Sequence, residues 1–157
     1  MKFQRGSEMN VEDWKYDAFV KANGGKFSVL DFVHAVFAKV SLPQDFTLCM
    51  GRFFAPRMIM LDGIIVASDW FDGERYKEYR NSGMSPRQAQ PWINMVEITD
   101  IFRGISFDNA KDLAALIAGL WDSRIIQNFP DEEARATVIL ENDAGEVFVT
   151  IGEYVKA

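Results

Sequence analysis

The amino-acid sequence predicts an α+β fold, in which about five or six helices pack on an antiparallel sheet built from two β-hairpins. Two observations lead to this prediction. Segments with helical periodicity come first, a pair of apolar strands follows, and the same order then repeats. The 157 residues are also 48% apolar and 13% aromatic, which is enough for one hydrophobic core. We therefore expect a single domain over residues 1–157, with residues 1–10 as a flexible tail.

Three helices are expected in the first part of the chain. Asn10 and Ser28 each precede an acidic residue by three positions, which is typical of a helix N-terminus. Proline is tolerated in the first turn of a helix and stops one elsewhere. The expected helices begin at Asn10, Ser28 and Pro43, and they end at Asn23-Gly24-Gly25, at Leu42 and before Pro56.

The first hairpin is indicated by two apolar runs around a two-residue turn. Residues 57–61 and 64–67 flank Asp62-Gly63, and the glycine permits the positive φ that such a turn needs. Both strands are apolar on both faces. We therefore expect neighbouring structure to cover both faces of this hairpin.

The second part of the chain repeats the order of helices and hairpin. Ser85-Pro86 begins a helix, and Asp108-Asn109 precedes another. Residues 92–102 contain enough Ile, Val and Thr to form a strand, but four apolar side chains at helical spacing favour a helix. The apolar residues of the helix after Asp108 are Leu113, Leu116, Ile117, Leu120, Trp121 and Ile125. Residues 136–140 and 146–151 form the second hairpin.

Composition excludes several classes of protein. One histidine, His34, and one cysteine, Cys49, leave little for a catalytic triad, a zinc site or a disulfide. Residues 1–10 lack the apolar run that a secretory signal needs, so we expect no such signal, and the longest apolar run is far shorter than the roughly 18 residues that a membrane span needs. We expect a cytoplasmic protein. A net charge of −6 opposes binding to nucleic acid.

No motif predicts a cofactor or a metal. Asp69, Asp72 and Glu74 lack the spacing of a calcium loop, and no glycine-rich phosphate loop follows a strand. We assign no catalytic residue and no metal ligand, and the oligomeric state stays open.

A cluster of rings and acids follows the first hairpin and is the predicted partner-binding surface. It consists of Asp69, Trp70, Phe71, Asp72 and Tyr76. Large rings at such a corner either fill the core or form an exposed anchor, and the sequence leaves this choice open. Elsewhere, Arg124 and Asn94 interrupt or border apolar helix faces, which favours structural hydrogen bonds over a ligand site.

Two functions are compatible with these features. The first is a non-catalytic, acidic binding protein that acts on another protein, with a basic partner favoured, as an inhibitor or immunity protein does. The alternative is a small carboxylate-dependent enzyme of the hydrolase type. Its acid and base would be Glu97 with Asp100, or Asp69 with Asp72.

Overall fold

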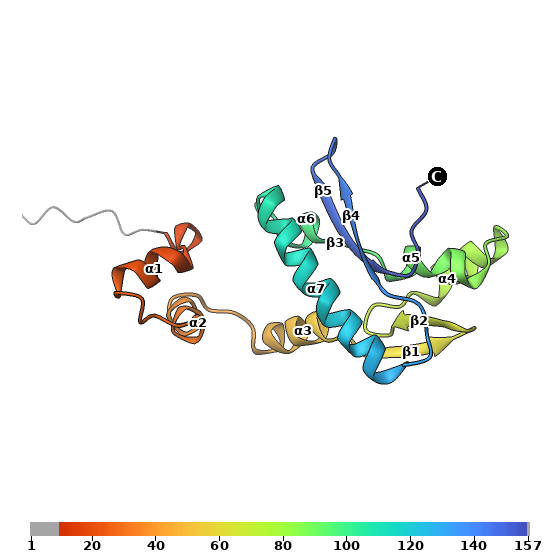
Figure 1. Cartoon of the computed structure of the whole chain (residues 1–157), viewed down its shortest axis with the longest axis horizontal. Helices are drawn as coiled ribbons and strands as arrows, with labels where there is room; N and C mark the ends of the chain where they lie inside the picture. Colours follow the sequence, from red (N-terminus) through yellow and green to blue (C-terminus); the bar gives the residue numbers. More distant parts are fainter. Residues whose placement is uncertain (1–9, 157) are drawn as a thin grey trace, which may run out of the picture. The chain divides into compact units, whose positions relative to one another are not determined.

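A computed structural model describes residues 10–156 of the chain and confirms the α+β class (Figure 1). Contacts divide the chain into two compact units, Met1–Thr47 and Leu48–Ala157. The described residues contain seven α-helices, one short 3-10 helix and five strands in two sheets. Except for Asn10, the predicted flexible tail lies outside the described residues.

The first unit is helical and is held together by aromatic rings. It contains the 3-10 helix η1 (Val11–Asp13), α1 (Tyr16–Ala22) and α2 (Val29–Phe37). The Phe32 ring packs 5.4 Å from Phe19 and 5.7 Å from Tyr16, centroid to centroid. Ser28 caps α2 as predicted: its hydroxyl accepts from the Asp31 N–H, and the Asp31 carboxylate accepts from the Ser28 N–H.

The second unit contains both sheets. Helix α3 (Gln44–Phe54) begins shortly before the division between the units. The elements that follow are β1 (Met58–Leu61), β2 (Ile64–Ala67), α4 (Gly73–Asn81), α5 (Pro86–Asn94), β3 (Val96–Glu97), α6 (Ile98–Ile101), α7 (Phe107–Asn128), β4 (Ala136–Glu141) and β5 (Glu146–Ile151).

The first hairpin turns at Asp62-Gly63, as predicted. These two residues have φ of 49° and 78°, the positive values that a two-residue turn of type I′ requires at both central positions. Strand β2 is buried along its whole length, with alternate residues in two different clusters of the core. Strand β1 differs from the expectation, because Ile59 and Met60 are 39% and 41% exposed.

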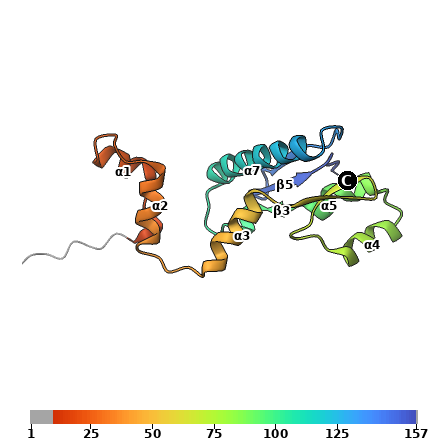
Figure 2. The same ribbon diagram turned by 90° about the horizontal axis from the view of Figure 1, so that it is seen from below.

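The second hairpin belongs to a three-stranded sheet in the order β3-β5-β4. Alternate residues of β5, Val147, Val149 and Ile151, share one face and pack in the same cluster as Ile117 and Trp121 of α7. Figure 2 shows α7 lying along this sheet. Thr150 has the opposite orientation, and its hydroxyl donates to the carbonyl of Pro91 in α5.

The two hairpins do not join into one sheet, because α5 lies between them. One edge of strand β2 pairs with β1. The backbone groups of its other edge form hydrogen bonds with side-chain amides of α5. Asn94 accepts from the Ala67 N–H at 2.9 Å and donates to the Ile65 carbonyl at 3.0 Å. Gln90 donates to the same carbonyl at 3.1 Å. With this edge occupied, β5 pairs with β3 and β4 instead.

The helix predicted over residues 92–102 is wrong. Helix α5 ends at Asn94, the backbone becomes extended, and β3 pairs with β5 before α6 begins. The register places Val96 opposite Val149 and Glu97 opposite Phe148. Pairing across the sheet therefore overrides the helical spacing of the apolar residues.

Helix α7 buries a narrower face than its large residues predict. The buried residues are Ala110, Ala114, Ile117, Ala118, Trp121 and Ile125. Small alanines let the helix approach the sheet closely. Leu116 and Leu120, which were expected in the apolar stripe, are 58% and 39% exposed.

None of the helices between residues 10 and 156 combines the length and the apolar character that crossing a bilayer requires.

Candidate functional site

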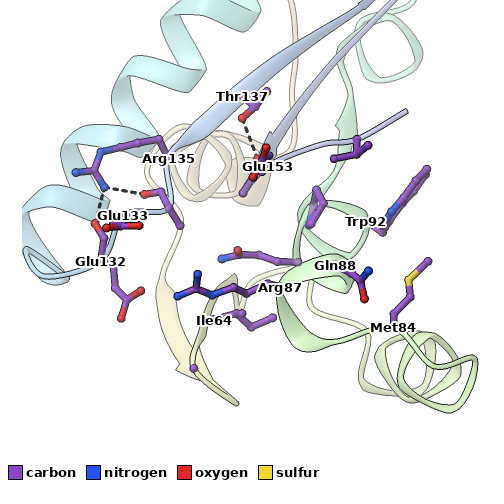
Figure 3. A pocket seen from close by; sticks show the side chains of 16 residues that line it. Ile64, Met84, Arg87, Gln88, Trp92, Glu132, Glu133, Arg135, Thr137 and Glu153 are labelled. Atoms are coloured by element: carbon purple, nitrogen blue, oxygen red, sulfur yellow. Dashed lines mark hydrogen bonds between the residues drawn. The ribbon is translucent and has the colours of Figure 1, made fainter. Parts of the chain in front are cut away.

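A cleft of about 750 Å³ lies between α5, the loop before β4 and the end of β5 (Figure 3). Its floor includes Gln90 and Gly152. Gly152 has φ of 102°, and a Cβ there would come within 2.8 Å of Gln90 Oε1. Gln90 is held in place by its hydrogen bond to the Ile65 carbonyl. This floor is therefore closely packed and leaves no room for a larger residue at position 152.

Charged side chains of both signs line this cleft. They are Arg87, Glu132, Glu133, Arg135 and Glu153. Arg135 donates to the carbonyls of Glu132 and Ala134 at 2.8 and 2.7 Å, so it folds back on its own loop. Figure 3 shows Arg87 extending from α5 across the cleft. Among residues 10–156, these five form no ion pair within 4.0 Å.

A second hollow, of about 540 Å³, has a different composition. It is lined by Arg52, Ala55, Arg57, Ser68, Asp69 and Arg124. Three arginines thus surround one space in a chain that is acidic overall. We call this space the arginine hollow.

The rings of the predicted partner-binding surface point into the core. Trp70 lies 5.4 Å from Trp121 and 6.1 Å from Phe53, centroid to centroid, and its buried Nε1 has no hydrogen-bond partner. Phe71 packs 5.9 Å from the buried Tyr76 in the other cluster. Trp70 and Phe71 therefore separate into two parts of the core, and neither Trp70 nor Tyr76 is an exposed anchor.

The hydroxyl of Tyr76 connects α4 to the first hairpin. It donates to Asp62 at 2.9 Å, at the turn residue with positive φ. Burial, and then the hydrogen bond to the Asp62 carboxylate, raise the pKa of Tyr76 above its ordinary value. The pair stabilises the turn as long as the phenol keeps its proton.

The two carboxylates of the predicted surface are exposed, but each also has a local structural contact. Asp72 caps α4 by accepting from the N–H groups of Glu74 and Arg75 at 3.0 and 3.1 Å. Asp69 accepts from the Arg57 N–H at 2.8 Å. The part of the predicted surface that is fully exposed is therefore its two carboxylates, while Trp70 and Phe71 are partly buried.

The two polar residues assigned structural roles make backbone contacts. Asn94 is 1% exposed and bonds the edge of β2. Arg124 is partly buried, and its Nε donates to the carbonyl of Pro56 at 2.9 Å, which connects α7 to the segment after α3.

The carboxylate pairs of the alternative enzyme do not meet in a cleft. Glu97 accepts from the Thr99 hydroxyl, and Asp100 is exposed on α6. Of the four residues in the two pairs, Asp69 alone lines either of the hollows described above. Within residues 10–156, no three His, Cys, Asp or Glu side chains come together as metal ligands would.

Sequence reasoning did not identify the exposed apolar face of α2. Val29, Leu30, Val33 and Phe37 are 63%, 79%, 47% and 46% exposed. The sequence does show these residues as an apolar stripe on the helix, but such a stripe is ordinarily buried in the core, so it does not predict an exposed face. Only contact information shows that Phe32, on the adjoining flank, already packs against α1.

Comparison with known proteins gives no match to this chain among family models, curated proteins or solved structures.

Proposed function

We propose that this chain is a non-catalytic binding protein that acts through protein–protein interaction, with α2 as its docking element. The observation that carries the proposal is the exposure of four large apolar side chains on a nine-residue helix. Clustered apolar exposure of this kind marks interaction sites, because isolated exposed residues are ordinary whereas contiguous patches are rare.

The exposed residues of α2 have the spacing of a helix that binds in a groove. Leu30, Val33 and Phe37 stand at positions i, i+3 and i+7, which place them on one face. The aromatic contacts of Phe32 with Tyr16 and Phe19 lie on the adjoining flank. Helix α2 therefore has a packing partner within its own unit and a further apolar face beyond it.

Charge supports a partner with a basic surface. Met1–Thr47 carries six acidic and six basic residues, so the unit that contains α2 is neutral. Leu48–Ala157 carries 17 acidic and 11 basic residues, which is the whole net charge of −6. The apolar face of α2 thus belongs to a neutral unit, and the excess negative charge belongs to the other unit. An inhibitor of a basic protein, or an immunity protein, would use this combination.

The experiment compares the full-length chain with a variant in which Leu30, Val33 and Phe37 are replaced by Gln. Glutamine keeps a good helix propensity while it removes the apolar surface. Leu116→Gln on α7 is the matched control, because Leu116 is 58% exposed in the other unit. Proteins captured by each form are quantified, and the binding of each purified candidate is measured directly.

The proposal expects a protein that binds the wild type and the control equally and the α2 variant at least tenfold more weakly. Its association rate should fall with added salt, as basic partners of acidic proteins do. Equal binding by all three forms would refute α2 as the docking element. Self-association lost only in the α2 variant would replace the basic partner with a second copy of the chain.

A further inference from the structure

The arginine hollow concentrates positive charge in the acidic unit of the chain. Its arginines come from the end of α3, the segment before β1 and the last turns of α7. Its lining includes three arginines and one carboxylate, that of Asp69, although acidic residues outnumber basic ones in Leu48–Ala157. The ion pairs in residues 10–156 are Lys77–Glu74, Lys111–Asp108 and Lys156–Glu141, so none of the three guanidiniums forms an ion pair with another described residue.

Arg124 is the fixed element of this hollow. Its Nε donates to the Pro56 carbonyl, which orients the guanidinium and leaves its other four N–H groups available. The residue is only partly exposed, and a partly buried guanidinium that forms no ion pair within the described residues is costly. An anion bound in the hollow would offset this cost.

The opposite wall of the hollow is held by backbone contacts. The Arg57 N–H donates to Asp69 at 2.8 Å, and the Arg57 carbonyl accepts from the Ser68 N–H at 2.8 Å and the Ser68 hydroxyl at 3.1 Å. The backbone that carries Arg57 is therefore tied to the segment after β2. The side chains of Arg52 and Arg57 are exposed at the rim.

We propose that the arginine hollow binds the phosphate group of a phosphate monoester. Guanidinium groups bind phosphate oxygens through paired, charge-assisted hydrogen bonds. Three arginines and Asp69 give the lining a charge of +2, which matches the roughly −1.5 to −2 of a phosphate monoester at pH 7. A single carboxylate ligand would leave positive charge uncompensated. The space of about 540 Å³ also accommodates a group larger than phosphate alone.

This site is separate from the docking face of α2, so either proposal can fail without the other. The phosphate can belong to a small metabolite or to a phosphorylated side chain. Three probes distinguish these sources: inorganic phosphate, O-phosphoserine and adenosine monophosphate. Each is titrated calorimetrically into the full-length chain at constant ionic strength, with chloride as the background anion.

The variants Arg52→Gln and Arg57→Gln should each weaken binding of the preferred probe by roughly tenfold. Neither side chain makes a hydrogen bond within the described residues, so both variants should melt as the wild type does. Arg103→Gln is the control, because this exposed arginine lines neither hollow. Asp69→Asn should have the opposite effect and tighten binding, since the amide oxygen can still accept from Arg57 while the repelling charge is gone.

The affinity for O-phosphoserine should also rise between about pH 5 and pH 7, as the second phosphate proton leaves near pH 6. Preference for O-phosphoserine would indicate a phosphorylated chain, and preference for the nucleotide would indicate a metabolite. The proposal is overturned if no probe binds, if Arg103→Gln weakens binding as much as the rim variants do, or if Asp69→Asn binds more weakly than the wild type.

Discussion

Asn94 takes the place of a neighbouring strand beside Ile65. Its Nδ2 donates to the Ile65 carbonyl at 3.0 Å, and its Oδ1 accepts from the next outward-facing N–H of β2 at 2.9 Å. An amide side chain offers one donor and one acceptor side by side, so it reproduces the pattern of a β-ladder over one repeat. Together with Gln90, which donates to the same Ile65 carbonyl, Asn94 ends the sheet at β2.

Replacing Asn94 with Ala should lower the free energy of unfolding by about 1–3 kcal/mol or more, because the buried Ala67 N–H loses its acceptor. The Ile65 carbonyl keeps the bond from Gln90. Urea denaturation measures the change. Asn128→Ala, at the exposed end of α7, is the control and should change little. Equal midpoints for the two variants would contradict the role of Asn94.

Gly152→Ala should destabilise the chain by roughly 1–3 kcal/mol. The φ of 102° is unfavourable for alanine, and the added Cβ would meet Gln90 Oε1 at 2.8 Å. Gly51→Ala on α3 makes a sharp comparison, because a Cβ at Gly51 meets nothing within 4 Å. It should stabilise the helix by about 0.5–1 kcal/mol. If the melting temperatures of both variants change in the same direction, the claim that position 152 cannot accept a Cβ is wrong.

The burial pattern of α7 can be tested with three substitutions. Ile117→Ala removes a fully buried side chain and should cost about 2–5 kcal/mol, whereas Leu120→Ala, at a 39% exposed position, should cost less. Asp122→Ala should cost roughly 1.5–3 kcal/mol, because Asp122 Oδ1 accepts from the Ala136 N–H at the start of β4. Chemical denaturation ranks the three, and a larger loss for Leu120 than for Ile117 would place the helix in a different register.

The Tyr76–Asp62 hydrogen bond should make stability depend on alkaline pH. The folded state raises the pKa of Tyr76 above the unfolded value of about 10 and so favours the neutral phenol. This stabilisation is fully present below about pH 10 and is lost as the pH rises through the folded pKa. The difference in unfolding free energy between wild type and Tyr76→Phe should therefore begin to shrink only above about pH 10. A constant difference would mean that Tyr76 is not perturbed.

Local chemistry explains which parts of the fold could be predicted from sequence. The Asp62-Gly63 turn and the Ser28 cap depend on residues within three positions of each other, and both form as expected. The separation of the two sheets depends on Asn94 and Gln90, which bond strand residues 25 to 29 positions away. No local pattern contains that information.

The candidate sites were less predictable for the same reason. Trp70 and Phe71 are neighbours in sequence, and only the packing of two separate clusters decides that both rings turn inward. The arginine hollow combines residues from positions 52 to 124, so its charge is invisible in any window of the sequence. The net charge of −6 argued against an anion site, because an acidic average conceals a local excess of arginine.

The packing of Trp70 against Trp121 provides the chain with an optical reporter. Two indole rings 5.4 Å apart at an angle of 35° are close enough for their electronic transitions to couple, and the Trp70 N–H is shielded from solvent. Emission from this pair should be that of indole in an apolar medium, and it should shift to the red when water reaches the rings. With Trp14 and Trp92 replaced by Phe, the colour of tryptophan fluorescence would thus report when α7 separates from the segment after β2, without any added label.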